Sequence, residues 1–121
     1  MGLDFSIGEH EPDGVITARW SYSGFHSFRE RIWYSCGFEG ELEEYYKNKG
    51  DKIETDHPLF HFFNHSDCDG ELEPEKLKVI VPMLEAILDL WDSRSWDTKQ
   101  GKILVENMKL CIDKDVPLIF C

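Results

Sequence analysis

Residues 74–91 read PEKLKVIVPMLEAILDLW, and this stretch decides the fold because its apolar side chains recur every three or four positions. That spacing places them on one face of a helix, so it predicts an amphipathic helix over 74–91. Pro74 suits the first turn, whereas Pro82 is expected to remove one backbone hydrogen bond and kink the helix. The apolar face comprises Leu77, Ile80, Val81, Leu84, Ile87, Leu88 and Trp91.

Further helices are predicted on both sides of this stretch. After a break at 93–97, a last helix is expected over 98–112. Upstream, an apolar stripe that includes Arg29 predicts a helix that Ser21 or Ser23 begins and Gly37 ends. Shorter helices are expected within 39–48 and from about His57, where Pro58 suits a helix start.

Strands are predicted near both ends of the sequence. Residues 3–7 alternate apolar and polar side chains, and 15–22 are rich in β-branched and aromatic residues. A turn at 12–14 favours a hairpin with a loop of about six to seven residues. Residues 116–120 form an apolar tail or an edge strand, because Pro117 disfavours a central position. The fold class is α+β in a single domain over 1–121: an N-terminal β-hairpin and a short C-terminal strand packed against three to four helices.

The negative charge is concentrated in one part of the chain. The net charge is −11, and residues 41–76 hold eleven acidic and four basic side chains. This sign opposes direct binding to nucleic-acid phosphates. The acidic block either serves a basic partner, binds a cation or keeps the protein soluble. For a protein partner, the predicted contact residues are Glu41, Glu43, Glu44, Tyr45 and Tyr46.

The segment 64–75, NHSDCDGELEPE, resembles a calcium loop in part. With Gly70 as the sixth loop residue, Asp67 and Asp69 fall at ligand positions three and five. The ends do not fit, because position one is His65 and position twelve is Lys76. The alternative needs no metal: the two aspartates accept backbone hydrogen bonds in a tight turn, and the glutamates that follow favour the helix N-terminus.

A zinc site overlaps this segment. His57, His61 and His65 are four residues apart, which would align them on one face of a continuous helix. The alternative is a partly exposed helix with ordinary polar histidines. The predicted cofactor is therefore none, or else calcium or zinc; the candidate metal ligands at the turn are His65, Asp67, Asp69, Glu71 and Glu73.

Other features bound the class of protein. The four cysteines contain no C-x-x-C pair, so reduced, mostly buried thiols are expected. No secretory signal is recognised and no apolar run approaches ~18 residues, so a cytoplasmic location without membrane contact is expected. The common motifs of hydrolases, metalloproteases and nucleotide-binding enzymes do not occur, so an enzyme is disfavoured. Arg29 and Arg31 are expected to bind an anion or, more commonly, nearby acids.

Three blocks of the sequence resemble a family of small uncharacterised bacterial and phage-encoded proteins. They are Ser21–Arg31 (SYSGFHSFRER), Asn64–Leu72 (NHSDCDGEL) and the closing Pro117–Cys121. The resemblance implies a shared architecture but no activity, ligand or catalytic residue. The leading hypothesis is a small acidic protein that acts by protein–protein interaction with a host or self-encoded protein, as an accessory factor or inhibitor. The alternative is a calcium- or zinc-binding module centred on 57–75.

Overall fold

The computed structural model describes residues 2–8, 14–37, 57–63 and 70–120 as an α+β fold. Its strands form one antiparallel sheet in the order β2-β1-β4-β3. The described elements, in chain order, are β1 (Gly2–Ile7), β2 (Arg19–Ser21), α1 (Tyr22–Ser35), α3 (Phe60–Phe63), β3 (Glu71–Leu72), α4 (Pro74–Asp89), α5 (Trp96–Lys114) and β4 (Leu118–Phe120). No helix within these ranges is long and apolar enough to cross a membrane.

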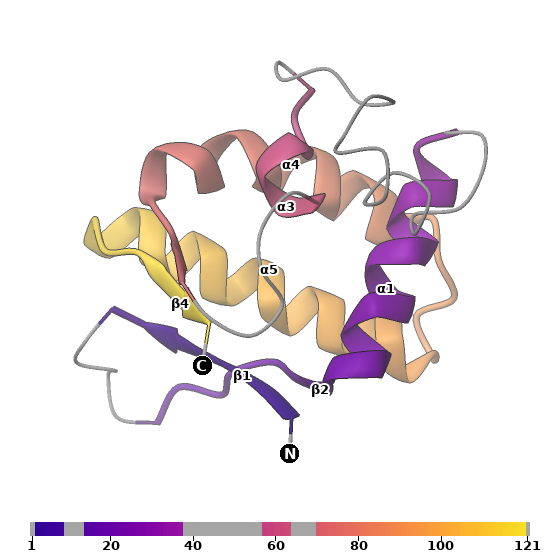
Figure 1. Ribbon diagram of the computed structural model, residues 1–121, viewed down its shortest axis with the longest axis horizontal. Helices are drawn as coiled ribbons and strands as arrows, with labels where there is room; N and C mark the ends of the chain where they lie inside the picture. The colour runs from indigo at the N-terminus through magenta and orange to yellow at the C-terminus, as the bar shows by residue number, and fades with distance from the viewer. Residues whose placement is uncertain (1, 9–13, 38–56, 64–69, 121) are drawn as a thin grey trace.

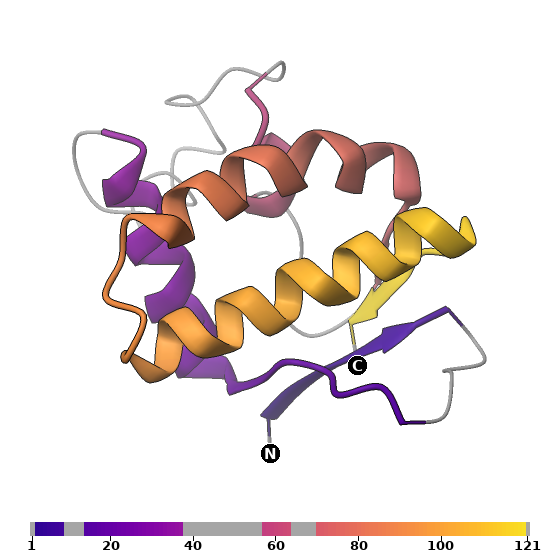
Figure 2. The same ribbon diagram turned by 180° about the vertical axis from the view of Figure 1, so that it is seen from behind.

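Alternation along the strands gives the sheet one buried face. In β1, Leu3, Phe5 and Ile7 are buried, while Asp4 and Ser6 between them remain partly exposed. The buried face lies against the helices, which stand above the strands in Figure 1. Seen from behind (Figure 2), α5 runs along the sheet with α4 antiparallel beside it. The opposite face of the sheet carries polar side chains.

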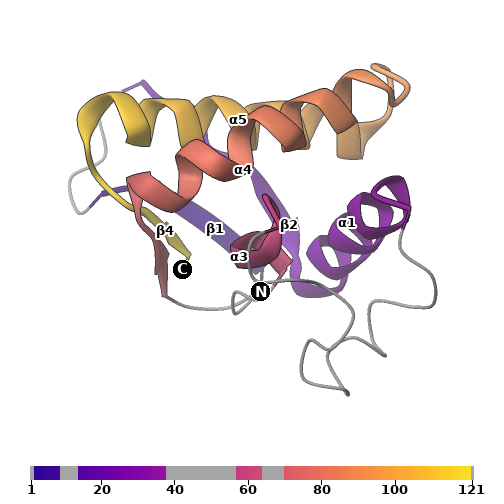
Figure 3. The ribbon, with the colours of Figure 1, turned by 90° about the horizontal axis from the view of Figure 1, so that it is seen from above.

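The core joins the sheet to the helices through aromatic rings. Phe5 on β1 lies edge-on to Phe120, Phe25 and Trp20, with ring centroids 4.9, 5.8 and 6.2 Å apart. Phe25 continues the cluster to Phe62 of α3, at 6.1 Å. Edge-to-face contacts of this kind add to the stability gained by burying the rings. In the view from above (Figure 3), α4 and α5 run side by side over this face, and α1 and α3 lie to one side of them.

The helices α4 and α5 confirm the sequence prediction and pack closely. Their predicted bounds were 74–91 and 98–112, and each differs from the structure by two residues at most. The helix α4 continues through Pro82, which lies on its exposed side. The close approach depends on Gly101, where an added Cβ would lie 2.7 Å from a side-chain carbon of Leu88 and 3.0 Å from the ring of Phe28.

The start of α1 also agrees with the sequence. Ser21 is its N-cap, and the Ser21 hydroxyl accepts a hydrogen bond from the Gly24 backbone N–H at 3.0 Å. This bond satisfies one of the donors that the first turn leaves unpaired. Gly37 follows the C-cap Cys36 with a φ of +83°, so it ends the helix as expected.

The second predicted strand is much shorter than expected. Only Arg19–Ser21 pairs with β1, and the connection therefore spans residues 8–18. The Asn107 side chain explains the difference, because it accepts from the Ala18 N–H and donates to the Ile16 carbonyl, both at 3.0 Å. Gln100 likewise accepts from the Arg19 N–H at 3.1 Å. Side chains of α5 thus replace a neighbouring strand along 16–19.

The predicted edge position of the C-terminal strand is wrong. β4 lies inside the sheet, between β1 and β3. Pro117 precedes the strand, so its missing N–H interrupts no ladder bond, and its carbonyl accepts from the Gly8 N–H at 2.9 Å. Gly8 has a φ of +69°, and a Cβ there would lie 3.1 Å from Val116 Cβ. A proline next to a strand is therefore compatible with a central strand.

Arg29 is buried in the core, with only 3% of its surface exposed. Its Nη1 donates to the carbonyls of Phe62 and Phe63 at 3.2 and 3.5 Å, and its guanidinium carbon lies 4.8 Å from the centroid of the Phe25 ring. A cation at the carboxyl end of a helix stabilises the carbonyls that the last turn leaves unpaired. Burial removes Arg29 from the solvent-facing anion site that the sequence suggested.

Candidate functional site

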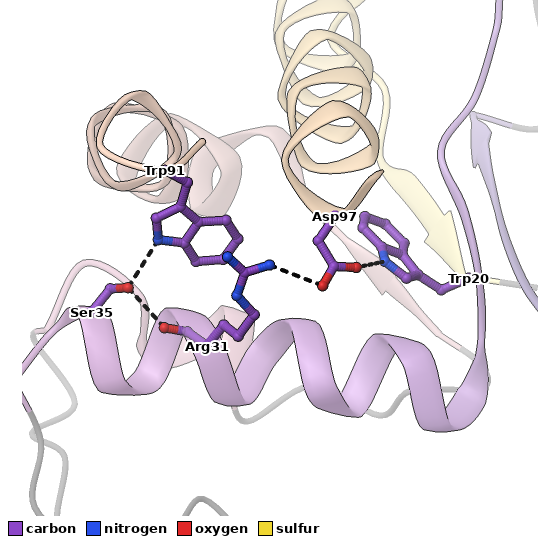
Figure 4. A network of polar contacts seen from close by, with 5 residues as sticks. All are labelled: Trp20, Arg31, Ser35, Trp91 and Asp97. Carbon is purple, nitrogen blue, oxygen red and sulfur yellow. Dashed lines mark hydrogen bonds and ion pairs between the residues drawn. The ribbon is translucent and has the colours of Figure 1, made fainter. Parts of the chain in front are cut away.

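Three of the four tryptophans lie near one end of the molecule, around the start of α5. Figure 4 shows Trp91 and Trp20 on either side of Arg31 and Asp97, with Ser35 completing the polar network. These residues come from β2, α1, the turn at 90–95 and the first turn of α5. We call this group the Trp–Arg network. It joins parts of the chain that are far apart in sequence.

Arg31 is the centre of the network. Its Nη1 donates to Asp97 Oδ2 at 3.1 Å, and its guanidinium carbon lies 4.1 Å from the centroid of the Trp91 ring. The indole N–H of Trp91 donates to the Ser35 hydroxyl at 3.1 Å, and that hydroxyl donates to the Arg31 carbonyl at 2.8 Å. An aromatic face together with a carboxylate is a stable receptor for a guanidinium cation. The pairing with Asp97 confirms the acid partner that the sequence suggested for Arg31.

Asp97 uses both carboxylate oxygens. Oδ2 accepts from Arg31, and Oδ1 accepts a long hydrogen bond of 3.5 Å from the Trp20 indole N–H. Asp97 also lies in the first turn of α5, where a negative charge is favourable. Its position therefore serves the helix and the network together.

A shallow hollow opens beside this network. It has a volume of about 240 Å³ and is lined by Leu3, Asp4, Arg19, Trp20, Ser21 and Trp96. Trp96 is 57% exposed, whereas Trp20 is buried, and their rings meet at 87° with centroids 6.2 Å apart. An exposed tryptophan supported by a buried one is a rigid apolar wall of the type found at protein interfaces.

Asp4 and Arg19 form the polar side of the hollow. They are direct partners across β1 and β2, and Arg19 Nε donates to Asp4 Oδ1 at 2.9 Å. Both side chains are well exposed, at 75% for Arg19 and 48% for Asp4, so the pair contributes little stability. Within the described residues, Asp4 Oδ2 has no hydrogen-bond partner.

A second hollow of about 200 Å³ lies between α4 and α5, over Leu88 and Val105. Two ion pairs join the helices at its rim: Lys102 lies 3.7 Å from Asp89, and Lys109 pairs with Glu85. The hydrogen bond that Lys109 donates to Glu85 is the main cause that raises the pKa of Lys109. These charged groups already pair with one another, so this hollow marks the contact between two helices.

Of the predicted metal ligands, the structure describes two. Glu71 lies in β3 and Glu73 is the N-cap of α4; both are exposed, while Leu72 between them is buried. His65, Asp67 and Asp69 lie outside the described residues. Among the residues that are described, no group of three His, Cys, Asp or Glu side chains is arranged to hold a metal ion. The calcium prediction for 64–75 stays a prediction.

The histidines of the zinc prediction are divided between two structural settings. His57 precedes α3, and its Nδ1 accepts from the Leu59 backbone N–H at 3.1 Å, so the ring proton lies on Nε2. His61 lies within α3, and partial burial, with a smaller effect of the Lys76 charge, lowers its pKa. His57 thus caps the turn, and binding zinc through Nε2 would move the ring proton to Nδ1 and break the hydrogen bond from Leu59. A thermal-shift titration with zinc and calcium tests both predictions: a rise in Tm that Asp67→Ala with Asp69→Ala abolishes would support them.

The predicted protein-contact residues Glu41, Glu43, Glu44, Tyr45 and Tyr46 lie outside the described residues. The charge of the described part is nevertheless informative. It holds twelve acidic and ten basic side chains, a net charge of −2, which leaves −9 for positions 9–13, 38–56 and 64–69. The described part of the chain is therefore nearly neutral.

Two of the cysteines are described, and both agree with the expectation of reduced thiols. Cys111 is buried and Cys36 is partly buried, and both are free. Burial raises the pKa of each thiol to about 11. Thiols of this kind stay protonated at neutral pH, so they are poor nucleophiles and behave as small apolar groups.

Sequence reasoning missed the Trp–Arg network and its hollow. One signal was present: residues 91–96, WDSRSW, place two tryptophans and an arginine in a polar break between helices. Tryptophan and arginine in an exposed connection are typical of binding surfaces. Comparison of the chain with protein-family models, curated proteins and solved structures gives no match.

Proposed function

We propose that this chain is a small protein-binding module that recognises a basic partner. The observation that carries the proposal is the uneven distribution of charge along the sequence: the described residues have a net charge of −2, and the remaining segments add −9. An excess of carboxylates attracts a positively charged surface and speeds its association.

The contact residues proposed within this charge are Glu41, Glu43, Glu44, Tyr45 and Tyr46. Tyrosine supplies contact area at low entropic cost, and the glutamates supply charge complementary to lysine and arginine. A host-directed accessory factor or inhibitor is the biological role that we favour. That role rests on the resemblance to small bacterial and phage-encoded proteins.

The experiment measures binding of a fluorescent lysine- and arginine-rich peptide to the whole protein at several salt concentrations. We expect affinity to fall steeply from low to physiological salt, because the attraction between exposed charges is screened. The triple variant Glu41→Gln, Glu43→Gln and Glu44→Gln should weaken binding by about tenfold, if each charge contributes about 0.5 kcal/mol.

A matched control removes three exposed carboxylates from the described framework: Glu75→Gln, Glu106→Gln and Asp113→Asn. Its net charge equals that of the triple variant, so the comparison separates position from total charge. Equal weakening in both variants, or an affinity insensitive to salt, would contradict the proposed contact surface.

A further inference from the structure

Trp91 shows how this protein holds an arginine. The Arg31 guanidinium lies 4.1 Å from the Trp91 ring centroid while its Nη1 donates to Asp97. One aromatic face and one carboxylate thus satisfy the two requirements of a guanidinium, which are stacking and charge-assisted hydrogen bonding. This site is already occupied, because Arg31 belongs to the same chain.

The hollow beside Trp96 offers the same two components, an aromatic face and a carboxylate, and both are accessible from solvent. Trp96 is 57% exposed, and it lines the hollow of about 240 Å³ together with Asp4. The Asp4 carboxylate gives Oδ1 to Arg19, and Oδ2 has no hydrogen-bond partner among the described residues. The hollow therefore combines an accessible indole with a carboxylate oxygen that can accept a further hydrogen bond.

We infer that this hollow receives an arginine side chain from a basic segment of the partner, which stacks on Trp96 and pairs with Asp4. The inference rests on the proposed function and adds a second contact surface for the same basic partner. The net charge of −11 favours a cationic occupant, and the 2.9 Å pair between Arg19 and Asp4 shows that this carboxylate accepts from a guanidinium. Arginine suits the site better than lysine because its planar group stacks and donates from several N–H groups.

Arg19 acts as an internal competitor at this site. It is 75% exposed and occupies one oxygen of Asp4. Removal of Arg19 should therefore strengthen the binding of an incoming arginine, although it makes the protein lose a surface contact. Removal of Arg19 would also strengthen the binding of any cation, because the protein loses a positive charge. The test therefore compares an arginine peptide with a lysine peptide, since only the competition favours arginine.

The experiment uses the whole protein and labelled peptides that alternate glycine with arginine, lysine or glutamate. We expect Trp96→Ala to weaken the arginine peptide about three- to tenfold and to erase its preference over lysine. Asp4→Asn should weaken it less. Arg19→Ala should strengthen the arginine peptide more than the lysine peptide. Ile16→Ala, which removes an apolar side chain that is even more exposed than Trp96, should change neither.

The outcomes separate the two proposals. If the arginine peptide binds with salt-dependent affinity that Trp96→Ala leaves unchanged, the protein recognises basic partners but this hollow is not the site. If Arg19→Ala weakens the arginine peptide, the competition at Asp4 is wrong. If the arginine peptide binds no better than the glutamate peptide, both the proposed function and this inference fail.

Discussion

Arg29 and Arg31 lie two residues apart on α1, yet they experience opposite environments. Arg29 is 3% exposed and donates to two backbone carbonyls of α3. The side chain of Arg31 is 43% exposed and donates to the carboxylate of Asp97. Each guanidinium also stacks on an aromatic ring of the fold. The comparison teaches that similar contacts have different energetic weight, because only the buried arginine would leave unsatisfied groups behind when it is removed.

The largest expected effect is at Arg29. Arg29→Ala should lower the free energy of unfolding by about 3 kcal/mol, because the α3 carbonyls lose a charged donor and a cavity remains. Urea denaturation measures this change. Arg29→Lys should recover a minor part, since one ammonium replaces a planar group. A loss similar to that of Arg31→Ala would break the comparison.

Asn107 extends the comparison to a neutral buried group. Asn107→Ala should cost about 2 kcal/mol, because the Ala18 N–H and the Ile16 carbonyl both lose their partner. Gln100→Ala, which removes the exposed bond to the Arg19 N–H, is the matched control and should cost less than half as much. If urea denaturation gave equal losses in the free energy of unfolding for the two variants, burial would not determine how much such a hydrogen bond stabilises the fold.

The thiol of Cys111 tests burial through pH. Its pKa in the folded protein is about 11, above the ordinary value of 9.0, so its contribution to stability is complete below pH 9 and is lost as pH rises through 11. The free energy of unfolding should fall by about 1 kcal/mol by about pH 10. Cys111→Ala should remove this part of the fall, while the part due to Cys36, whose pKa burial also raises to about 11, should remain. An unchanged profile would contradict the effect.

The smallest effect is expected at Arg31. Arg31→Ala should cost about 1 kcal/mol, and the Arg31–Asp97 coupling in a double-mutant cycle with Asp97→Asn should be about 0.5 kcal/mol. Added salt should reduce this coupling, because the pair is partly exposed. The stacking on Trp91 is tested separately by Trp91→Leu. If salt left the coupling energy unchanged, Arg31 would behave like the buried Arg29, and the comparison would fail.

The sequence predicted elements whose evidence is local. The pattern of 74–91 is long and strongly periodic, and Ser21 and Gly37 carry the usual signals for the ends of a helix, so these predictions were confirmed. The extent of β2 was not predictable in this way. The apolar residues of 15–18 suit a strand, but their backbone groups bond to Asn107, which lies far away in the sequence. The central place of β4 depended on Pro117 lying one residue before the strand.

The candidate site was largely hidden from the sequence for a related reason. Arg31 and Asp97 are 66 positions apart, and Trp20 and Asp97 are 77 positions apart. A pattern within one window carries no information on such pairs. The acid-rich segments, by contrast, were visible at once in the composition, and their proposed contacts remain predictions.

By itself, the sequence determined the helices, the N-terminal strand, the α+β class and the uneven charge, because helix and strand periods and composition are properties of neighbouring residues. The tertiary structure alone decided which polar groups are buried, where β4 lies in the sheet and which tryptophan stays exposed. These depend on distant segments meeting, and two arginines on one helix acquire different roles only when α3 covers one of them and α5 reaches the other.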